Sequence, residues 1–391
     1  MPNLANLTQC TGCTACSAVC PKQCIEMKKD AEGFLHPFVN SDQCIQCHLC
    51  EKVCPVLSDC SVNKVIPSAC AVISKDESIR LDSSSGGFFS ELSTKILEDN
   101  GYIYGAAYNE LFEVHHICVD NVNDLSKLRG AKYSQSNLGD TFIDIKTKLD
   151  QNIKVLFSGT PCQVAGLKSY LRKEYDNLIC VDFVCHGVPS PMAWKEYIKY
   201  RSELDNQGEL PVSINLRSKD TGWSKYTYSN LFEYKNGKKQ YNSSSDSLFM
   251  KLFVGDYINR LSCSDCKFKG YSRVSDFTIG DFWGIWDIDP VMDDNKGTSV
   301  VLVQSEKGKK LLDEIKNNLI IKEVTLEQAS QQNPSMLVSS SAKPNRSEVL
   351  EMIRDGRISE CEKMFVVKAP SFTQKIKGKL SRLMHKVRNH E

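Results

Sequence analysis

The chain has 391 residues, which is enough for two or three domains with a substantial core. Its 49 basic and 48 acidic residues nearly balance, so no overall field favours nucleic acid or an anionic surface. No apolar run approaches the roughly twenty residues that cross a bilayer, and the opening MPNLANL lacks the basic and apolar regions of a signal peptide. We therefore expect a cytoplasmic protein whose 18 cysteines bind metal or catalyse rather than form disulfides.

Residues 1–62 are the first predicted domain, and they carry two copies of the pattern C-x-x-C-x-x-C-x-x-x-C-P. In such runs the first three thiolates bind one 4Fe–4S cube, and the fourth binds the other cube. The pattern assigns one cube to Cys10, Cys13, Cys16 and Cys54, and the second cube to Cys44, Cys47, Cys50 and Cys20. The alternative is a pair of zinc sites, but zinc frameworks usually place two C-x-x-C pairs well apart.

Between the two runs, residues 25–27 and 34–37 read as short strands around a polar turn that ends in Gly33. Cys24 falls outside the ligand register, and we interpret it as a small residue packed against a cube. Residues 57–67 are polar and aperiodic, which is typical of a linker.

Residues 66–205 are predicted to form the N-terminal part of an α/β body. A strand at 69–73 precedes a serine and glycine loop at 83–87 and an amphipathic helix that ends at Asn100-Gly101. Paired strands at 102–108 and 112–119 and a helix at 140–149 follow. The loop before the helix offers backbone N–H groups to a phosphate, although serine and glycine are also ordinary helix caps. His115 and His116 are neighbours on one strand and should face opposite ways, so we do not expect joint ligands.

The next segment is predicted to be a βαβ unit, with strands at 154–157 and 178–184. The helix between them has Thr160 as N-cap and Pro161 in its first turn. Such a unit implies parallel strands whose carboxyl ends share the edge where α/β sheets bind ligands. Cys162 and Cys185 follow these ends. Cys162 could be a nucleophile, because a helix N-terminus lowers the pKa of a thiol; otherwise it is only part of a capped helix start, and Cys185 a buried small residue.

Residues 206–340 are predicted to form the C-terminal part of the body, after a helix at 192–204. We expect strands at 212–216 and 226–234, with a hairpin turn at 235–238, and then a helix at 248–254. Further strands are expected at 276–280, 299–303 and 320–324, with a helix at 307–317. Cys263-x-x-Cys266 alone fits zinc or a redox pair. Together with Cys162 and Cys185, the pair could hold a third cube.

Residues 341–391 are predicted to form C-terminal helices and a basic tail. From residue 368 the apolar side chains fall on one helical face among seven basic residues, and such a helix can lie on an anionic membrane surface. A solvated terminal helix is the commoner outcome. The cysteines without an assigned role are interpreted as packing residues: Cys60, Cys70, Cys118, Cys180 and Cys361.

Several of these motifs, taken in order, resemble the beta-subunit family of coenzyme F420 hydrogenases and dehydrogenases over about residues 8–285. Besides the cysteine runs, they are Ser84-Ser85-Gly86-Gly87, residues 129–133 (RGAKY), residues 157–163 (FSGTPCQ), residues 185–190 (CHGVPS), Cys263-x-x-Cys266 and residues 280–284 (GDFWG). The family usually has serine where this chain has Ala131, a departure that could cost one hydrogen bond.

The resemblance implies an FAD-dependent iron–sulfur oxidoreductase of mixed α/β (α+β) fold with a fused two-cluster ferredoxin domain. It supports Cys162, Cys185, Cys263 and Cys266 as ligands of a body cluster. It also places the flavin near Ser84, Ser85, Gly86, Gly87, Lys132, Tyr133, Ser134, Gly159 and Thr160. The implied partner is a redox carrier such as a ferredoxin or a deazaflavin. The alternatives are an electron-transfer subunit without its own substrate site, and a ferredoxin pair on a scaffold or transferase body.

Overall fold

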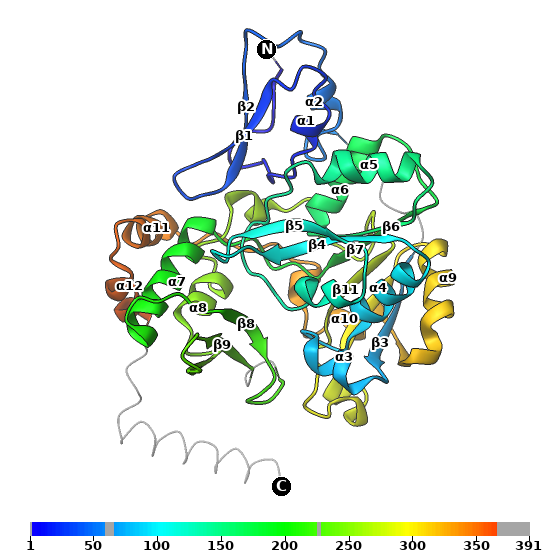
Figure 1. The fold of residues 1–391 in the computed structure, drawn as a ribbon, viewed down its shortest axis with the longest axis vertical. Coiled ribbons are helices and arrows are strands. Elements are labelled where there is room, and N and C mark those ends of the chain that lie inside the picture. The colour runs from blue at the N-terminus through cyan, green and yellow to red at the C-terminus, as the bar shows by residue number, and fades with distance from the viewer. Residues whose placement is uncertain (1, 59–65, 225–227, 366–391) are drawn as a thin grey trace, which may run out of the picture.

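A computed structural model of the chain describes residues 2–58, 66–224 and 228–365 (Figure 1). Cys60, most of the predicted linker, the first residues of the strand predicted at 226–234 and the basic tail lie outside these ranges. Within them the chain forms a mixed α/β body with a small N-terminal part at one end, which confirms the predicted fold class.

The N-terminal part is a hairpin with two one-turn helices. Strand β1 (Ile25–Lys29) pairs antiparallel with β2 (Leu35–Val39), as predicted, and helices α1 (Ala15–Ala18) and α2 (Leu49–Lys52) contain the third cysteines of the two runs, Cys16 and Cys50. The carboxylate of Asp30 accepts hydrogen bonds from the backbone N–H groups of Glu32 and Phe34, and Gly33 takes a φ of +84°. These contacts fix the turn whose outer residues reach the body.

The body contains an eight-stranded sheet in the order β13-β3-β12-β11-β7-β6-β4-β5. Neighbouring strands β11, β7, β6 and β4 run parallel, and the remaining pairs are antiparallel. The strands are β3 (Ser68–Ser74), β4 (Tyr102–Tyr108), β5 (Val114–Val119), β6 (Val155–Ser158), β7 (Leu178–Phe183), β11 (Phe277–Asp281), β12 (Ser299–Val303) and β13 (Leu319–Val324). The predicted parallel pairing of the βαβ unit is confirmed, so the carboxyl ends of its strands share one edge.

Helices cover both faces of this sheet. On one face, α4 (Phe88–Glu98) and α9 (Glu306–Ile315) bury their apolar side chains, Leu92 and Leu311 among them, against β4, β7 and β11. On the other face, α5 (Thr141–Asp150) and α6 (Pro161–Leu171) bury Phe142 and Leu167 against β6 and β7. The apolar period of the sequence predicts these helices because it provides each with one buried face.

A second lobe lies beside the sheet (Figure 1). Its core surrounds Trp194, Tyr197 and Phe249 and is built from α7 (Pro191–Asn206), α8 (Leu248–Val254), α11 (Arg346–Arg354), α12 (Ile358–Phe365) and the sheet of β8 (Ser213–Ser218), β9 (Ser229–Glu233) and β10 (Lys239–Ser243). The chain then returns to the main sheet with β11, β12 and β13. Strands from both sides of the predicted division at residue 205 therefore share one sheet.

Two smaller helices in the body, α3 (Glu77–Asp82) and α10 (Leu326–Ser330), were not predicted from the sequence pattern. Cys70, Cys180 and Cys361 are buried, as their predicted packing role requires. Cys118 is exposed on the edge strand β5, so the packing role predicted for it is wrong. Among the described residues, no helix is both long and apolar enough to span a membrane.

The N-terminal part is docked on the body through buried and partly buried polar contacts. The guanidinium of Arg346 in α11 forms a two-pronged ion pair with the carboxylate of Glu32, and the hydroxyl of Ser190 donates to the Glu32 carbonyl over 2.5 Å. The backbone N–H of Leu35 donates to the side-chain amide oxygen of Gln135 over 2.9 Å. The Lys267 ammonium donates to the carbonyl of Val56, which follows the second cysteine run. The N-terminal cysteines are thus held in one place relative to the sheet.

Candidate functional site

The first predicted group of thiols comes together beside the body. Burial, and then the neighbouring thiols of Cys10 and Cys54, raise the pKa of Cys16 to about 12. Burial and the thiol of Cys16 also raise the pKa of Cys13 well above its usual range. These four side chains are the set that the cysteine pattern assigns to one cube.

The second predicted group lies on the far side of the N-terminal part. Cys20, Cys44, Cys47 and Cys50 line one small cavity together with Cys24. The Sγ atom of Cys24 lies 3.4 Å from that of Cys20, and its side chain is buried. This position agrees with the interpretation of Cys24 as a residue packed against the second cube.

The third group forms between the sheet and the second lobe. Cys162 begins α6, where Thr160 and Gln163 form the predicted N-cap as a reciprocal capping box, and Cys185 follows β7. Burial, and the neighbouring thiols of Cys266 and Cys263, raise the pKa of Cys162 to about 12 although the Thr160 hydroxyl opposes the shift. Burial and the thiol of Cys263 likewise raise the pKa of Cys185. The structure therefore brings together the four cysteines that we predicted could hold a third cube.

Burial raises the pKa of Cys162, which weighs against the alternative prediction of an activated nucleophile. The helix N-terminus would favour a thiolate, but burial beside three other thiols favours the neutral thiol more strongly. Buried thiols of this kind lose their protons when they bind a metal centre, because the bound cation compensates each thiolate charge.

The donor chemistry of the three groups fits iron–sulfur clusters. Within the part of the chain that the structure describes, no three His, Cys, Asp or Glu side chains converge closely enough to ligate a single metal ion. The four ligands of a cubane bind four different irons at separate corners, so their sulfur atoms lie farther apart than the ligands of one zinc ion. Four thiols per group supply the number and kind of donors that a cubane needs.

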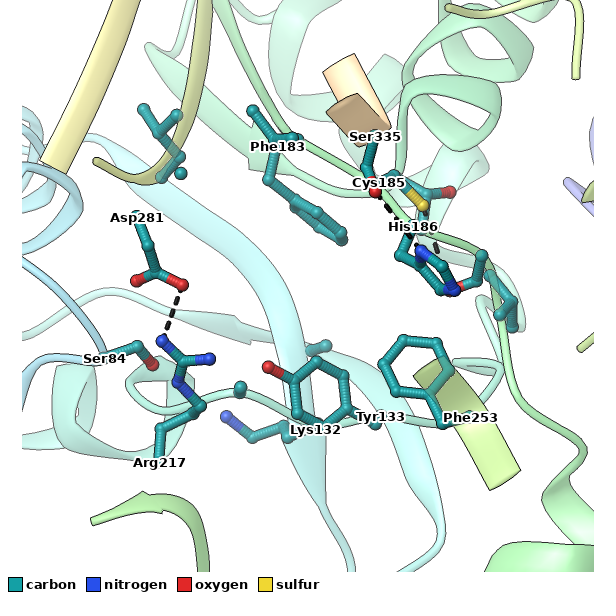
Figure 2. Close-up of a pocket in the computed structure, with 18 of the residues that line it drawn as sticks. Ser84, Lys132, Tyr133, Phe183, Cys185, His186, Arg217, Phe253, Asp281 and Ser335 are labelled. Carbon is teal, nitrogen blue, oxygen red and sulfur yellow. Dashed lines mark hydrogen bonds and ion pairs between the residues drawn. The ribbon is translucent and has the colours of Figure 1, made fainter. Parts of the chain in front are cut away.

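A cavity of about 1080 Å³ opens beside the third group (Figure 2). It lies past the carboxyl ends of β6, β7 and β11, where Ser158, Phe183 and Asp281 contribute to its wall. Cys162 and Cys185 line the same space. Ligand pockets in proteins usually measure about 300–1,000 Å³, so this cavity has room for a large cofactor.

Eight of the nine predicted flavin contacts line this cavity: Ser84, Ser85, Gly87, Lys132, Tyr133, Ser134, Gly159 and Thr160. Gly86 is not among the lining residues. Its backbone N–H donates to the hydroxyl of Ser299 over 2.9 Å, and a Cβ at this position would lie 2.2 Å from the carbonyl oxygen of Val72. The close approach to β3 explains why only glycine fits there.

The cavity also contains charged groups that the sequence did not single out. Arg217 from β8 donates to Asp281 over 2.6 Å (Figure 2). Its guanidinium also lies over the rings of Tyr228 and Trp223. Burial raises the pKa of Asp281, and the Arg217 charge opposes the shift. The buried Nε atom of Arg217 has no hydrogen-bond partner among the described residues, and neither has the hydroxyl of Thr11, which also lines the cavity. Both polar atoms are therefore buried without a partner at the wall of the cavity.

Lys132 and His116 add two further polar groups to the wall. The ammonium of Lys132 donates to the carbonyls of Arg129 and Gly130, while burial lowers its pKa to about 7. Burial also lowers the pKa of His116 to about 4, so its ring is neutral and bridges Ser136 and the carbonyl of Ser158. Of the two histidines on β5, only His116 lines the cavity, in agreement with the predicted opposite orientations.

On the other side of Cys185, His186 lies 2.8 Å from a carboxylate oxygen of Asp256 and 3.2 Å from the hydroxyl of Ser335 (Figure 2). The ring packs edge-on against Phe253. These contacts hold the segment after Cys185 in place. The sequence pattern could not have revealed them, because the partners are far apart in the chain.

Comparisons with known proteins match two parts of this chain. Residues 153–329 match the family model for the C-terminal part of the coenzyme F420 hydrogenase/dehydrogenase beta subunit, and residues 9–57 match the 4Fe-4S dicluster domain. The first match contains all four cysteines of the third group, and the second contains the eight cysteines of the two runs.

Among solved structures, a chain of the xenon-derivatised F420-reducing NiFe hydrogenase complex from Methanosarcina barkeri is similar to this one at 13% identity and a TM-score of 0.45. The similarity covers 78% of this chain and 93% of that chain. No curated protein matches the sequence.

Proposed function

We propose that this chain, which belongs to the coenzyme F420 hydrogenase/dehydrogenase beta-subunit family and carries an N-terminal 4Fe–4S dicluster domain, is an iron–sulfur flavoprotein oxidoreductase. The two N-terminal thiol groups would hold two clusters, the third group a further cluster, and the cavity an FAD. When bound, FAD supplies a two-electron step and the clusters supply single-electron steps to an external carrier such as a ferredoxin or a deazaflavin.

The observation that carries this proposal is the shared wall between the cavity and the third thiol group. Cys162 and Cys185 line the same space as Ser84, Lys132 and the other predicted flavin contacts. A cofactor in that space would lie next to a cluster held by those thiols. The size of the cavity also weighs against the alternative of an electron-transfer subunit without its own substrate site.

The residues around the cavity have the chemistry that an FAD requires. The loop of Ser84 and Ser85 leads into α4, an eleven-residue helix whose N-terminus attracts anionic phosphates. Lys132 and Arg217 bring positive charge to the same wall. The apolar side chains of Phe183 and Phe253 offer surfaces for a flat ring system (Figure 2). These groups would bind, orient and desolvate the cofactor.

The test compares two cysteine variants after anaerobic purification. Cys185→Ala removes one thiol of the third group, whereas Cys180→Ala removes a buried thiol of β7, the strand that precedes Cys185, and this thiol belongs to no group. We expect iron in the Cys185 variant to fall by about four per chain, because one cubane loses a ligand, and the control to keep its iron and FAD. Equal iron in both variants would contradict a cluster at the third group.

A further inference from the structure

Arg260 connects the N-terminal part to the third thiol group. It precedes the short helix that carries Cys263, and its backbone N–H donates to the carbonyl of Val188. Its side chain extends the other way, where Nε donates to the Cys10 carbonyl over 2.7 Å and Nη2 donates to the Leu35 carbonyl over 2.9 Å. Only 2% of the residue is exposed.

The guanidinium of Arg260 has no carboxylate partner among the described residues. Its side-chain partners there are two carbonyls, the amide oxygen of Gln135 and the ring of His36, which in turn lies 3.1 Å from the carboxylate of Asp30. A buried cation is costly unless an opposite charge compensates it. The nearby groups that become anionic when they bind iron are the thiols on either side.

The structure places Arg260 between two of the three thiol groups. It contacts the Cys10 backbone directly, and its charge also favours the thiolate forms of Cys162 and Cys263. The two groups adjoin each other, since a Cβ on Gly166 of α6 would lie 2.8 Å from the Cβ atom of Cys13. Cys47 of the remaining group is exposed to solvent.

We propose that Arg260 is a positioning residue that docks the Cys10 group against the Cys162 group and raises the reduction potentials of the two clusters held there. This inference rests on the proposed function, because it requires clusters at both groups. Each one-electron transfer between them removes one negative charge from one cube and adds one to the other, with no bond made or broken. A buried cation between the cubes stabilises the reduced, more negative form of each.

The test is a redox titration of the full holoprotein, followed by electron paramagnetic resonance. Arg260→Gln removes the charge, and Arg260→Lys keeps the charge but loses the planar two-pronged donor. Arg346→Gln disturbs docking at Glu32 and removes the hydrogen bond from Arg346 to the Asn259 carbonyl, but it leaves the Arg260 charge in place. We expect Arg260→Gln to make two of the three couples at least about tenfold harder to reduce, or about 59 mV lower, while the third stays unchanged. Arg260→Lys and Arg346→Gln should leave the potentials close to those of the wild type.

The role of Arg260 is overturned if Arg260→Gln leaves all potentials unchanged, or if Arg346→Gln lowers the same two couples equally. If Arg260→Gln does not assemble its clusters, Arg260→Lys becomes the test. A shift of about 59 mV in the reduction potentials of Arg260→Lys, despite the retained charge, would also overturn the role of Arg260. Iron content separates this inference from the proposed function. About eight irons in the wild type would refute the third cluster itself, whereas about twelve irons with unchanged potentials in the variant would refute only the role of Arg260.

Discussion

Glu32→Gln should loosen the N-terminal part from the body. Both prongs of the Arg346 guanidinium bind the Glu32 carboxylate, and the Arg346 side chain is 4% exposed while that of Glu32 is 26% exposed. Breaking a fully buried ion pair costs about 3–5 kcal/mol, because the remaining charge stays buried without a partner. Since water reaches part of Glu32, and glutamine can still accept one hydrogen bond, we expect about 2–3 kcal/mol here.

Hydrogen exchange of the holoprotein measures this cost at the site where it arises. A loss of about 2–3 kcal/mol raises the opening equilibrium of the hairpin about 30-fold to 140-fold, so amides of β1 and β2 should exchange faster by that factor. Glu26→Gln on the same hairpin is the control, because the Glu26 side chain is 71% exposed and its pair with Lys28 contributes little. Equal exchange in the two variants would refute the reasoning.

Two further predictions concern the cavity. Because burial lowers the pKa of Lys132 to about 7, its ammonium charge is present below that pH and lost above it, so FAD affinity should fall as the pH rises through about 7. In a fluorescence titration of FAD binding, Lys132→Met should have an affinity that does not change with pH in this range. A wild-type affinity that is independent of pH would contradict the prediction. Thr160→Ala and Thr325→Ala each remove a capping-box hydroxyl and should each cost about 1 kcal/mol by thermal unfolding. Only Thr160→Ala should also weaken FAD binding, and equal affinities would exclude a role for this hydroxyl at the cavity.

Local patterns in the sequence predict most elements of the main sheet. The apolar run at 178–184, the Thr160 cap and the hairpin around Gly33 each depend on neighbours in the chain, and the structure has them within a residue or two. Helices α3 and α10 are missed because they have only six and five residues, too few for a helical period.

Long-range order is harder to predict. The return of β11 to the sheet beside β7 brings Arg217 and Asp281 together although they are 64 residues apart. The burial of Arg260 depends on a contact with Cys10, which is 250 residues away. The raised pKa of Cys162 arises from the same long-range packing, because burial and the thiols of Cys263 and Cys266 outweigh a helix start that would by itself lower the pKa. Spacing within one segment carries no information on such partners.

Iron, sulfide and flavin analysis of one anaerobically purified wild-type sample tests the central claim most directly. The twelve grouped thiols and the cavity beside them predict about twelve irons and one FAD per chain. About eight irons with no flavin would contradict the proposal, and would leave a two-cluster domain attached to a body of another purpose.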